Sequence, residues 1–135
     1  MNDRFTILVA DRNRYVRDFL RREFAAAGYR VVVAKDAIEL RRLIQRCRPL
    51  HLLVLDLEIP YMGGVTVLEQ IRLEYPSLPV ILHMFMTEEM SHPAFQDVAA
   101  VVEKSGNPDE LMRTVSQALR RRYPQDFVAE HAEVL

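Results

Sequence analysis

Short apolar runs alternate along the chain with longer segments in which apolar residues recur every three or four positions. Five runs have the length of a β-strand and are largely apolar throughout: Phe5–Ala10, Arg30–Ala34, His51–Leu55, Leu78–His83 and Val98–Val102. A strand that is apolar on both faces is typical of a parallel sheet with helices covering each side. The pattern therefore predicts an α/β domain built from stacked β-α-β units.

The segments between and after these runs predict five helices. Four of them carry a single buried stripe, through residues 15–24, 38–47, 65–71 and 111–119. The fifth, within Thr87–Gln96, is weakly periodic and contains Pro93, so it predicts a short or irregular helix at best. After residue 122, Tyr123 and Pro124 break the pattern. We therefore expect a domain over residues 1–122 and a C-terminal tail over 123–135, which forms a short helix or frays.

Composition narrows the class of protein. A chain of 135 residues with 50% hydrophobic residues has the proportions of one globular domain. The formal net charge of -1 gives no indication of a nucleic-acid or membrane partner. Cys47 is the single cysteine, and no signal-peptide pattern follows Met1. These features predict a cytoplasmic protein that binds neither nucleic acid nor membrane.

Charged residues follow three of the predicted strands: Asp11 and Arg12 follow the first, Asp56 follows the third, and Lys104 lies just after the fifth. The fourth strand is followed by the uncharged Met84. Ligands of open parallel sheets bind at the carboxyl ends of the strands. Adjacent strands lie about 4.8 Å apart, so Asp11 and Asp56 would reach a shared cation or phosphoryl group if the first and third strands are neighbours.

These segments resemble the receiver domain of two-component response regulators. Asp56-Leu57-Glu58-Ile59-Pro60-Tyr61-Met62-Gly63-Gly64 looks like the phosphoacceptor segment of that family. Three other segments look like its first, fourth and fifth strands: Ile7-Leu8-Val9-Ala10-Asp11, Pro79-Val80-Ile81-Leu82 and Val101-Val102-Glu103-Lys104. The resemblance runs from about Thr6 to Leu119. It implies a doubly wound, flavodoxin-like sheet of five strands in the order 2-1-3-4-5.

The resemblance also implies a function and the residues that carry it. Asp56 would accept a phosphoryl group from a histidine kinase or a phosphotransfer protein. Asp11, Asp56 and the backbone carbonyl of Glu58 would hold Mg²⁺, and Lys104 would pair with the phosphoryl oxygens. Such a domain takes part in a phosphorelay and is not an enzyme. The 16 residues after Leu119 are too few for an effector domain. We therefore expect a stand-alone receiver that signals through an output protein or a homodimer.

Three residues depart from the family pattern. Arg12 stands where the family has a second acid, Met84 replaces the Ser or Thr that ends the fourth strand, and Val101 replaces an aromatic residue. An arginine beside the carboxylates weakens binding of Mg²⁺ by electrostatic repulsion. Arg12 either pairs with Asp11 or Asp56 in place of the cation, or turns away and leaves a weak Mg²⁺ site. We favour the pairing.

The departures leave a second function open, that of a degenerate receiver acting as a phosphate-independent interaction module. A phosphatase of the haloacid-dehalogenase type is disfavoured, because its Asp-x-Asp motif lies at the first strand. The histidines are too scattered for a zinc site, and His83 is expected in the core. Met84, Phe85 and Met86 are interpreted as packing rather than docking residues. Arg120, Arg121 and Arg122 are explained by the helix dipole and solvation.

Overall fold

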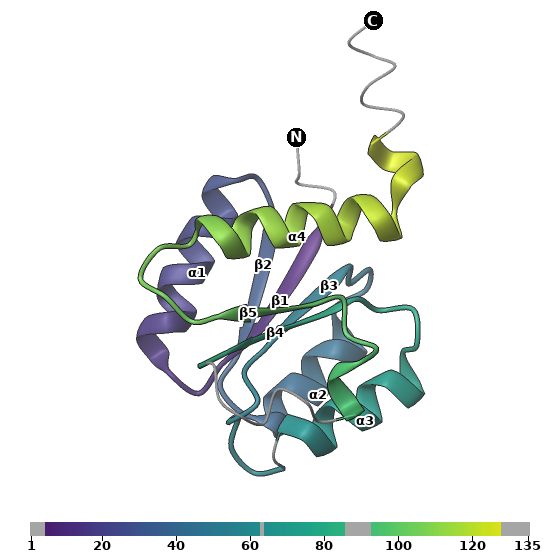
Figure 1. Cartoon of the computed structure of the whole chain (residues 1–135). Coiled ribbons are helices and arrows are strands. Elements are labelled where there is room, and N and C mark those ends of the chain that lie inside the picture. The colour runs from purple at the N-terminus through teal and green to yellow at the C-terminus, as the bar shows by residue number, and fades with distance from the viewer. Residues whose placement is uncertain (1–4, 63, 86–92, 128–135) are drawn as a thin grey trace, which may run out of the picture.

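The computed structural model describes residues 5–62, 64–85 and 93–127. Its centre is a five-stranded parallel sheet in the order β2-β1-β3-β4-β5, which confirms the predicted doubly wound topology (Figure 1). Along the chain the elements are β1 (Thr6–Ala10), α1 (Arg14–Ala26), β2 (Arg30–Ala34), α2 (Ala37–Arg46), β3 (Leu52–Leu55), α3 (Gly64–Glu74), β4 (Val80–Met84), η2 (Pro93–Phe95), β5 (Ala100–Glu103) and α4 (Asp109–Arg122).

Helices cover both faces of the sheet, as the apolar runs predict. On one face α1 and α4 bury residues such as Phe24 and Leu119 against the strands. On the other face α2 and α3 do the same with Leu40 and Leu68. Figure 1 shows these two layers on opposite sides of the sheet. No helix in the described segments is both long enough and apolar enough to span a lipid bilayer.

Local hydrogen bonds explain where the first two helices begin. The Asn13 side chain accepts from the backbone N–H groups of Tyr15 and Val16, so it caps α1. Asp36 caps α2 by accepting from the backbone N–H of Glu39 at 2.8 Å. After α1 the chain turns at Gly28, whose φ of 94° lies in the left-handed region that glycine adopts without strain.

The connection between β4 and β5 is the least helical of the crossovers. Within the described residues it contains only η2, one turn of 3₁₀ helix over Pro93–Phe95, and residues 86–92 lie outside them. Proline has no backbone N–H and fixes φ, so Pro93 opens a turn there and does not continue a helix. The described chain therefore has four α-helices, and the short or irregular fifth segment that the sequence predicts is this turn.

The first residues of the predicted C-terminal tail lie against the domain. Residues 124–127 are helical, and the Phe127 ring stacks on Phe5 with centroids 5.5 Å apart. The Tyr123 hydroxyl donates to the backbone carbonyl of His51 at 3.0 Å. Aromatic pairs of this kind are worth about 1 kcal/mol beyond the area they bury. Where the domain ends stays a prediction, but Tyr123 and Phe127 pack beside the starts of β1 and β3.

Candidate functional site

The register of the sheet brings the charged strand ends together. Ala10 at the end of β1 pairs with Leu55 at the end of β3, so Asp11 and Asp56 follow at neighbouring positions. The residue before Lys104 pairs with Met84 at the end of β4. The side chains of Asp11 and Asp56 are each 2% exposed, and that of Lys104 is 8% exposed. The predicted cluster of two carboxylates and an ammonium is thus formed, and it is almost completely buried.

Asp11 has a partner for each carboxylate oxygen. Its Oδ1 accepts from the backbone N–H of Asn13 at 2.8 Å, and its Oδ2 lies 3.0 Å from Lys104 Nζ. Burial raises the pKa of the Asp11 carboxyl group, and the neighbouring charge of Asp56 raises it further. The hydrogen bond from Asn13 and the ammonium of Lys104 act in the opposite direction. On this pKa, burial and the Asp56 charge together outweigh the Asn13 hydrogen bond and Lys104.

Asp56 is held in a similar way from two sides. Its Oδ1 accepts from the backbone N–H of Glu58 at 3.0 Å and lies 3.4 Å from Lys104 Nζ. Its Oδ2 accepts from the backbone N–H of Arg12 at 3.2 Å. Lys104 therefore joins the carboxylates of Asp11 and Asp56, and the loops after β1 and β3 fix how the Asp56 carboxylate is turned.

The Arg12 side chain lies beside the end of β3 and does not turn away from it. Its Nε is 4.0 Å from Asp56 Oδ2, and a terminal guanidinium nitrogen forms an ion pair with the Glu58 carboxylate. The Arg12 side chain is 45% exposed and the Glu58 side chain 60% exposed, so solvent screens this pair. Of the two alternatives for Arg12, the arrangement corresponds to pairing with Asp56. The Glu58 side chain is a partner that the sequence did not reveal.

The two positions where the family has a switch residue lie in the core. Met84 ends β4 with an exposed fraction of 9%, and Val101 is partly buried against the same core cluster on β5. Neither side chain has a hydroxyl or another hydrogen-bonding group for a phosphoryl group. Phe85 is 59% exposed, and its ring centroid lies 5.5 Å from Lys104 Nζ. Met84 packs as predicted, whereas Phe85 does not, and Met86 lies outside the described residues.

His83, expected in the core, is indeed buried on β4, and 6% of it is exposed. Burial lowers the pKa of its imidazole to about 4, and the nearby Lys104 ammonium adds to the effect. Its Nδ1 has no hydrogen-bond partner among the residues that the structure describes. His51 is also shifted, because burial lowers its pKa, and its Nδ1 accepts from the backbone N–H of Thr6 at 2.9 Å. Both imidazoles are therefore neutral in the native state at pH 7.

The lowered pKa of His83 predicts a loss of stability in mild acid. The unfolded imidazole takes up a proton below pH 6.5, whereas the folded one resists protonation down to about pH 4. The contribution of His83 to the free energy of unfolding is therefore most favourable above pH 6.5. At pH 5 this contribution is lower by about 2 kcal/mol. Urea unfolding of wild type and His83→Leu at pH 7.5 and pH 5 measures this effect. The variant should lose about 2 kcal/mol less than wild type between these pH values. An equal loss in both proteins would refute the assignment to His83.

The carboxylates of Asp11 and Asp56 already have partners with which Mg²⁺ would have to compete. Mg²⁺ requires near-octahedral oxygen ligands. All four carboxylate oxygens of Asp11 and Asp56 already face an N–H group or a cation. In the described part of the chain, no three His, Cys, Asp or Glu side chains are grouped to hold a metal ion. The third acid at this edge, Glu58, pairs with Arg12. Lys104 and Arg12 therefore lie where their positive charges compete with a divalent ion for the same carboxylates.

Comparison with known proteins gives one consistent family. A family model described as the response regulator receiver domain matches residues 7–116. The response regulator MprA of Mycobacterium leprae is 33% identical over 122 residues, which make up 89% of this chain and 53% of that protein. MprA of Mycobacterium avium is 34% identical over 122 residues, with the same coverage. The chain spans about half the length of these curated relatives.

Solved structures share the fold. The response regulator TrrA of Thermotoga maritima, in complex with Mg²⁺-BeF, is 27% identical with a TM-score of 0.79, covering 84% of this chain and 98% of that one. TrrA in complex with the histidine kinase ThkA is 28% identical with a TM-score of 0.78, covering 85% of this chain and 98% of that one. A CheY-like receiver domain protein of Methanospirillum hungatei is 23% identical with a TM-score of 0.81, covering 90% and 98%, and supports the fold alone.

Proposed function

Because this chain belongs to the response regulator receiver domain family of two-component signalling, we propose that it accepts a phosphoryl group on Asp56. The observation that carries the proposal is the Asp56 carboxylate, buried at a strand end between Lys104 and Arg12. A carboxylate so placed is a nucleophile whose reaction depends on charge compensation.

The step is a transfer between two covalent bonds. A carboxylate oxygen of Asp56 attacks the phosphorus of a phosphohistidine on a histidine kinase or phosphotransfer protein. The new O–P bond forms an acyl phosphate as the P–N bond breaks, and the imidazole nitrogen keeps the electron pair. Lys104, on the Oδ1 side, faces the added negative charge. Arg12, on the Oδ2 side, does the same. Met84 and Val101 add no hydrogen bond to the product.

Arg12 sets this receiver apart from the family pattern. Its guanidinium supplies beside Asp56 part of the positive charge that Mg²⁺ supplies in the complex of the relative TrrA. We therefore expect Mg²⁺ to bind weakly and to change the rate of phosphorylation little. Planar guanidinium groups with several donors suit phosphoryl oxygens well.

Acetyl phosphate and intact-mass spectrometry test this proposal. With excess acetyl phosphate, wild type should gain the mass of one phosphoryl group, both with Mg²⁺ and with a chelator in place of it. The Asp56→Asn variant lacks the nucleophile and should gain nothing. The matched control is Asp18→Asn, which removes a half-exposed acid of α1 that pairs with Arg14, and it should leave the adduct unchanged. An adduct that persists in Asp56→Asn would show that another residue is modified.

A second candidate function is supported by the same arginine. The pairing of Arg12 with Glu58 and Asp56 already compensates the carboxylates without a phosphoryl group. A receiver fixed in this way acts as a phosphate-independent interaction module. The absence of any adduct, with or without Mg²⁺, would favour this function over phosphorylation.

Output through protein contacts is part of the proposal. Exposed aromatic side chains follow the strand ends that carry the site. Tyr15, in the first turn of α1, is 81% exposed, Tyr61, in the segment between β3 and α3, is 79% exposed, and Phe85 lies over Lys104. Aromatic residues are enriched at protein interfaces. We propose this edge of the sheet as the surface that meets a kinase, an output protein or a second copy of the chain.

A further inference from the structure

A pocket lies at the opposite edge of the sheet from the Asp56 site. It has a volume of about 200 Å³ and is bordered by the segments just before β3 and β4 and by the end of α4. Leu50 precedes β3, Leu78 precedes β4, and Tyr123 follows α4. This position is the amino end of the parallel strands. The pocket is therefore separate from the phosphoacceptor site, and what binds there does not depend on the chemistry of Asp56.

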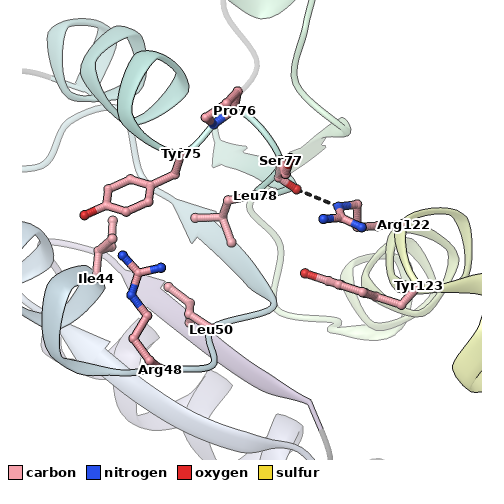
Figure 2. Close-up of a pocket in the computed structure, with 9 residues that line it drawn as sticks. All are labelled: Ile44, Arg48, Leu50, Tyr75, Pro76, Ser77, Leu78, Arg122 and Tyr123. Carbon is pink, nitrogen blue, oxygen red and sulfur yellow. Dashed lines mark hydrogen bonds between the residues drawn. The ribbon is translucent and has the colours of Figure 1, made fainter.

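Two arginines face this pocket. The Arg48 guanidinium lies over the Tyr75 ring, 5.1 Å from its centroid, and the Arg122 guanidinium lies 4.7 Å from the centroid of the Tyr123 ring. The Nε of Arg122 also donates to the Ser77 carbonyl at 2.8 Å. Figure 2 shows the two guanidinium groups on opposite sides of Leu50 and Leu78. A ring contact and a backbone hydrogen bond therefore position Arg122, and a ring contact positions Arg48, although both arginines are exposed.

Neither arginine forms an ion pair with a carboxylate in the part of the chain that the structure describes. The residues that line the pocket include no Asp or Glu. The acid next to Tyr75, Glu74, is paired with Arg41 at 3.1 Å. The lining itself therefore carries two positive charges and no negative one, and an acid outside it, Asp126, influences Tyr123. This balance favours an anionic ligand.

The rest of the lining is apolar. The Ile44 side chain is buried, and Leu50 and Leu78 are partly buried beside it. A site with an apolar floor and a few fixed polar groups is typical of small-molecule binding. Inorganic phosphate would gain nothing from the leucines, whereas a ring bearing a carboxylate would bury its apolar body and pair its charge. The volume limits the ligand to a compact molecule.

We infer that this Arg48–Arg122 pocket binds a small aromatic carboxylate. The carboxylate pairs with a guanidinium through parallel N–H···O bonds. The ring packs on the side chains of Leu50 and Leu78. Arg122 thereby has a role beyond the helix dipole and solvation that its position in the sequence indicates.

Benzoate is the probe for this site. In a ¹⁵N-labelled sample of the full chain at fixed ionic strength, benzoate should shift the amide signals of Leu78 and Tyr123 with a saturable dissociation constant of about 1 mM. Benzamide has the same ring without the charge and should bind at least about tenfold more weakly. Inorganic phosphate should cause no saturable shift of these signals.

Matched variants complete the test. Arg48→Gln and Arg122→Gln should each weaken benzoate binding about threefold to fivefold. Arg46→Gln makes the same change of charge on an exposed residue of α2 outside the lining and should leave the affinity unchanged. The Arg48→Gln variant keeps the Arg122–Ser77 hydrogen bond. Weaker binding in this variant is therefore not explained by the loss of that structural contact. Absence of saturation, equal binding in all three variants, or phosphate binding as tightly as benzoate would overturn the inference.

Discussion

Replacing Arg12 with Asp raises the affinity of the site formed by Asp11 and Asp56 for Mg²⁺ about a hundredfold. A unit charge about 6 Å from a divalent ion contributes roughly 5 kcal/mol at an effective dielectric constant of about 20. The Arg12 side chain is 45% exposed, so solvent reduces the effect. We therefore expect about 3 kcal/mol for the reversal of charge. Titration with Mg²⁺, followed by the amide signals near Asp11 and Asp56, measures this change.

The control for this variant is Arg14→Asp. It makes the same change of charge two residues along the chain, where the side chain is 80% exposed and pairs with Asp18 at 3.8 Å. Its Mg²⁺ affinity should stay close to that of wild type. Arg12→Asp should also make phosphorylation by acetyl phosphate depend on Mg²⁺, because the guanidinium beside Asp56 is gone. An Arg12→Asp variant that binds Mg²⁺ no better than Arg14→Asp would contradict the electrostatic role of Arg12.

Removing Lys104 is expected to cause the largest loss of stability. Its ammonium lies 3.0 Å from Asp11 Oδ2 and 3.4 Å from Asp56 Oδ1, and all three side chains are almost fully buried. Lys104→Met leaves two buried carboxylates without their shared cation. Removing one partner of a buried ion pair lowers the free energy of unfolding by about 3 kcal/mol or more. We expect the free energy of unfolding at pH 7.5 to fall by about 2–4 kcal/mol, because protonation of one carboxyl group relieves part of the cost.

The pH dependence distinguishes this mechanism from a loss of packing. In Lys104→Met the folded-state pKa of a carboxyl group rises above its unfolded value, so the variant loses stability as pH increases through that raised pKa. The deficit relative to wild type should therefore be smaller at pH 5 than at pH 7.5. Adding Asp56→Asn should restore part of the stability. Lys35→Met, at an exposed lysine, is the control. If Lys104→Met unfolds at the same urea concentration as this control, the buried cluster does not depend on Lys104.

The positions of the strands, and of the charged residues at their ends, could be predicted well from the sequence. Its apolar runs located the five strands, and because parallel strands end at a common edge, Asp11, Asp56 and Lys104 could be placed together before any side-chain geometry was known. The strand order followed from resemblance to the receiver family. It was confirmed by the pairing of β1 with both β2 and β3.

Other features depend on local geometry that residue patterns do not encode. The ion pair between Arg12 and the Glu58 side chain forms because the loops after β1 and β3 run side by side. The packing of Phe127 on Phe5 depends on how the chain turns after α4, at Tyr123. Long-range contacts of this kind join residues more than 40 positions apart. The family resemblance implied only a backbone-carbonyl role for Glu58, and the residue pattern after position 122 predicted only a tail.

The most direct measurement for Asp56 is chemical trapping of the acyl phosphate. After incubation with acetyl phosphate and a chelator, borohydride reduces an aspartyl phosphate to homoserine, and peptide mass spectrometry locates the converted residue. Phosphorylation of Asp56 predicts homoserine at position 56 in wild type and in Arg14→Asp, and none in Asp56→Asn. Unmodified Asp56 in wild type, with or without Mg²⁺, or homoserine at another position, would contradict the proposal that this receiver accepts a phosphoryl group on Asp56.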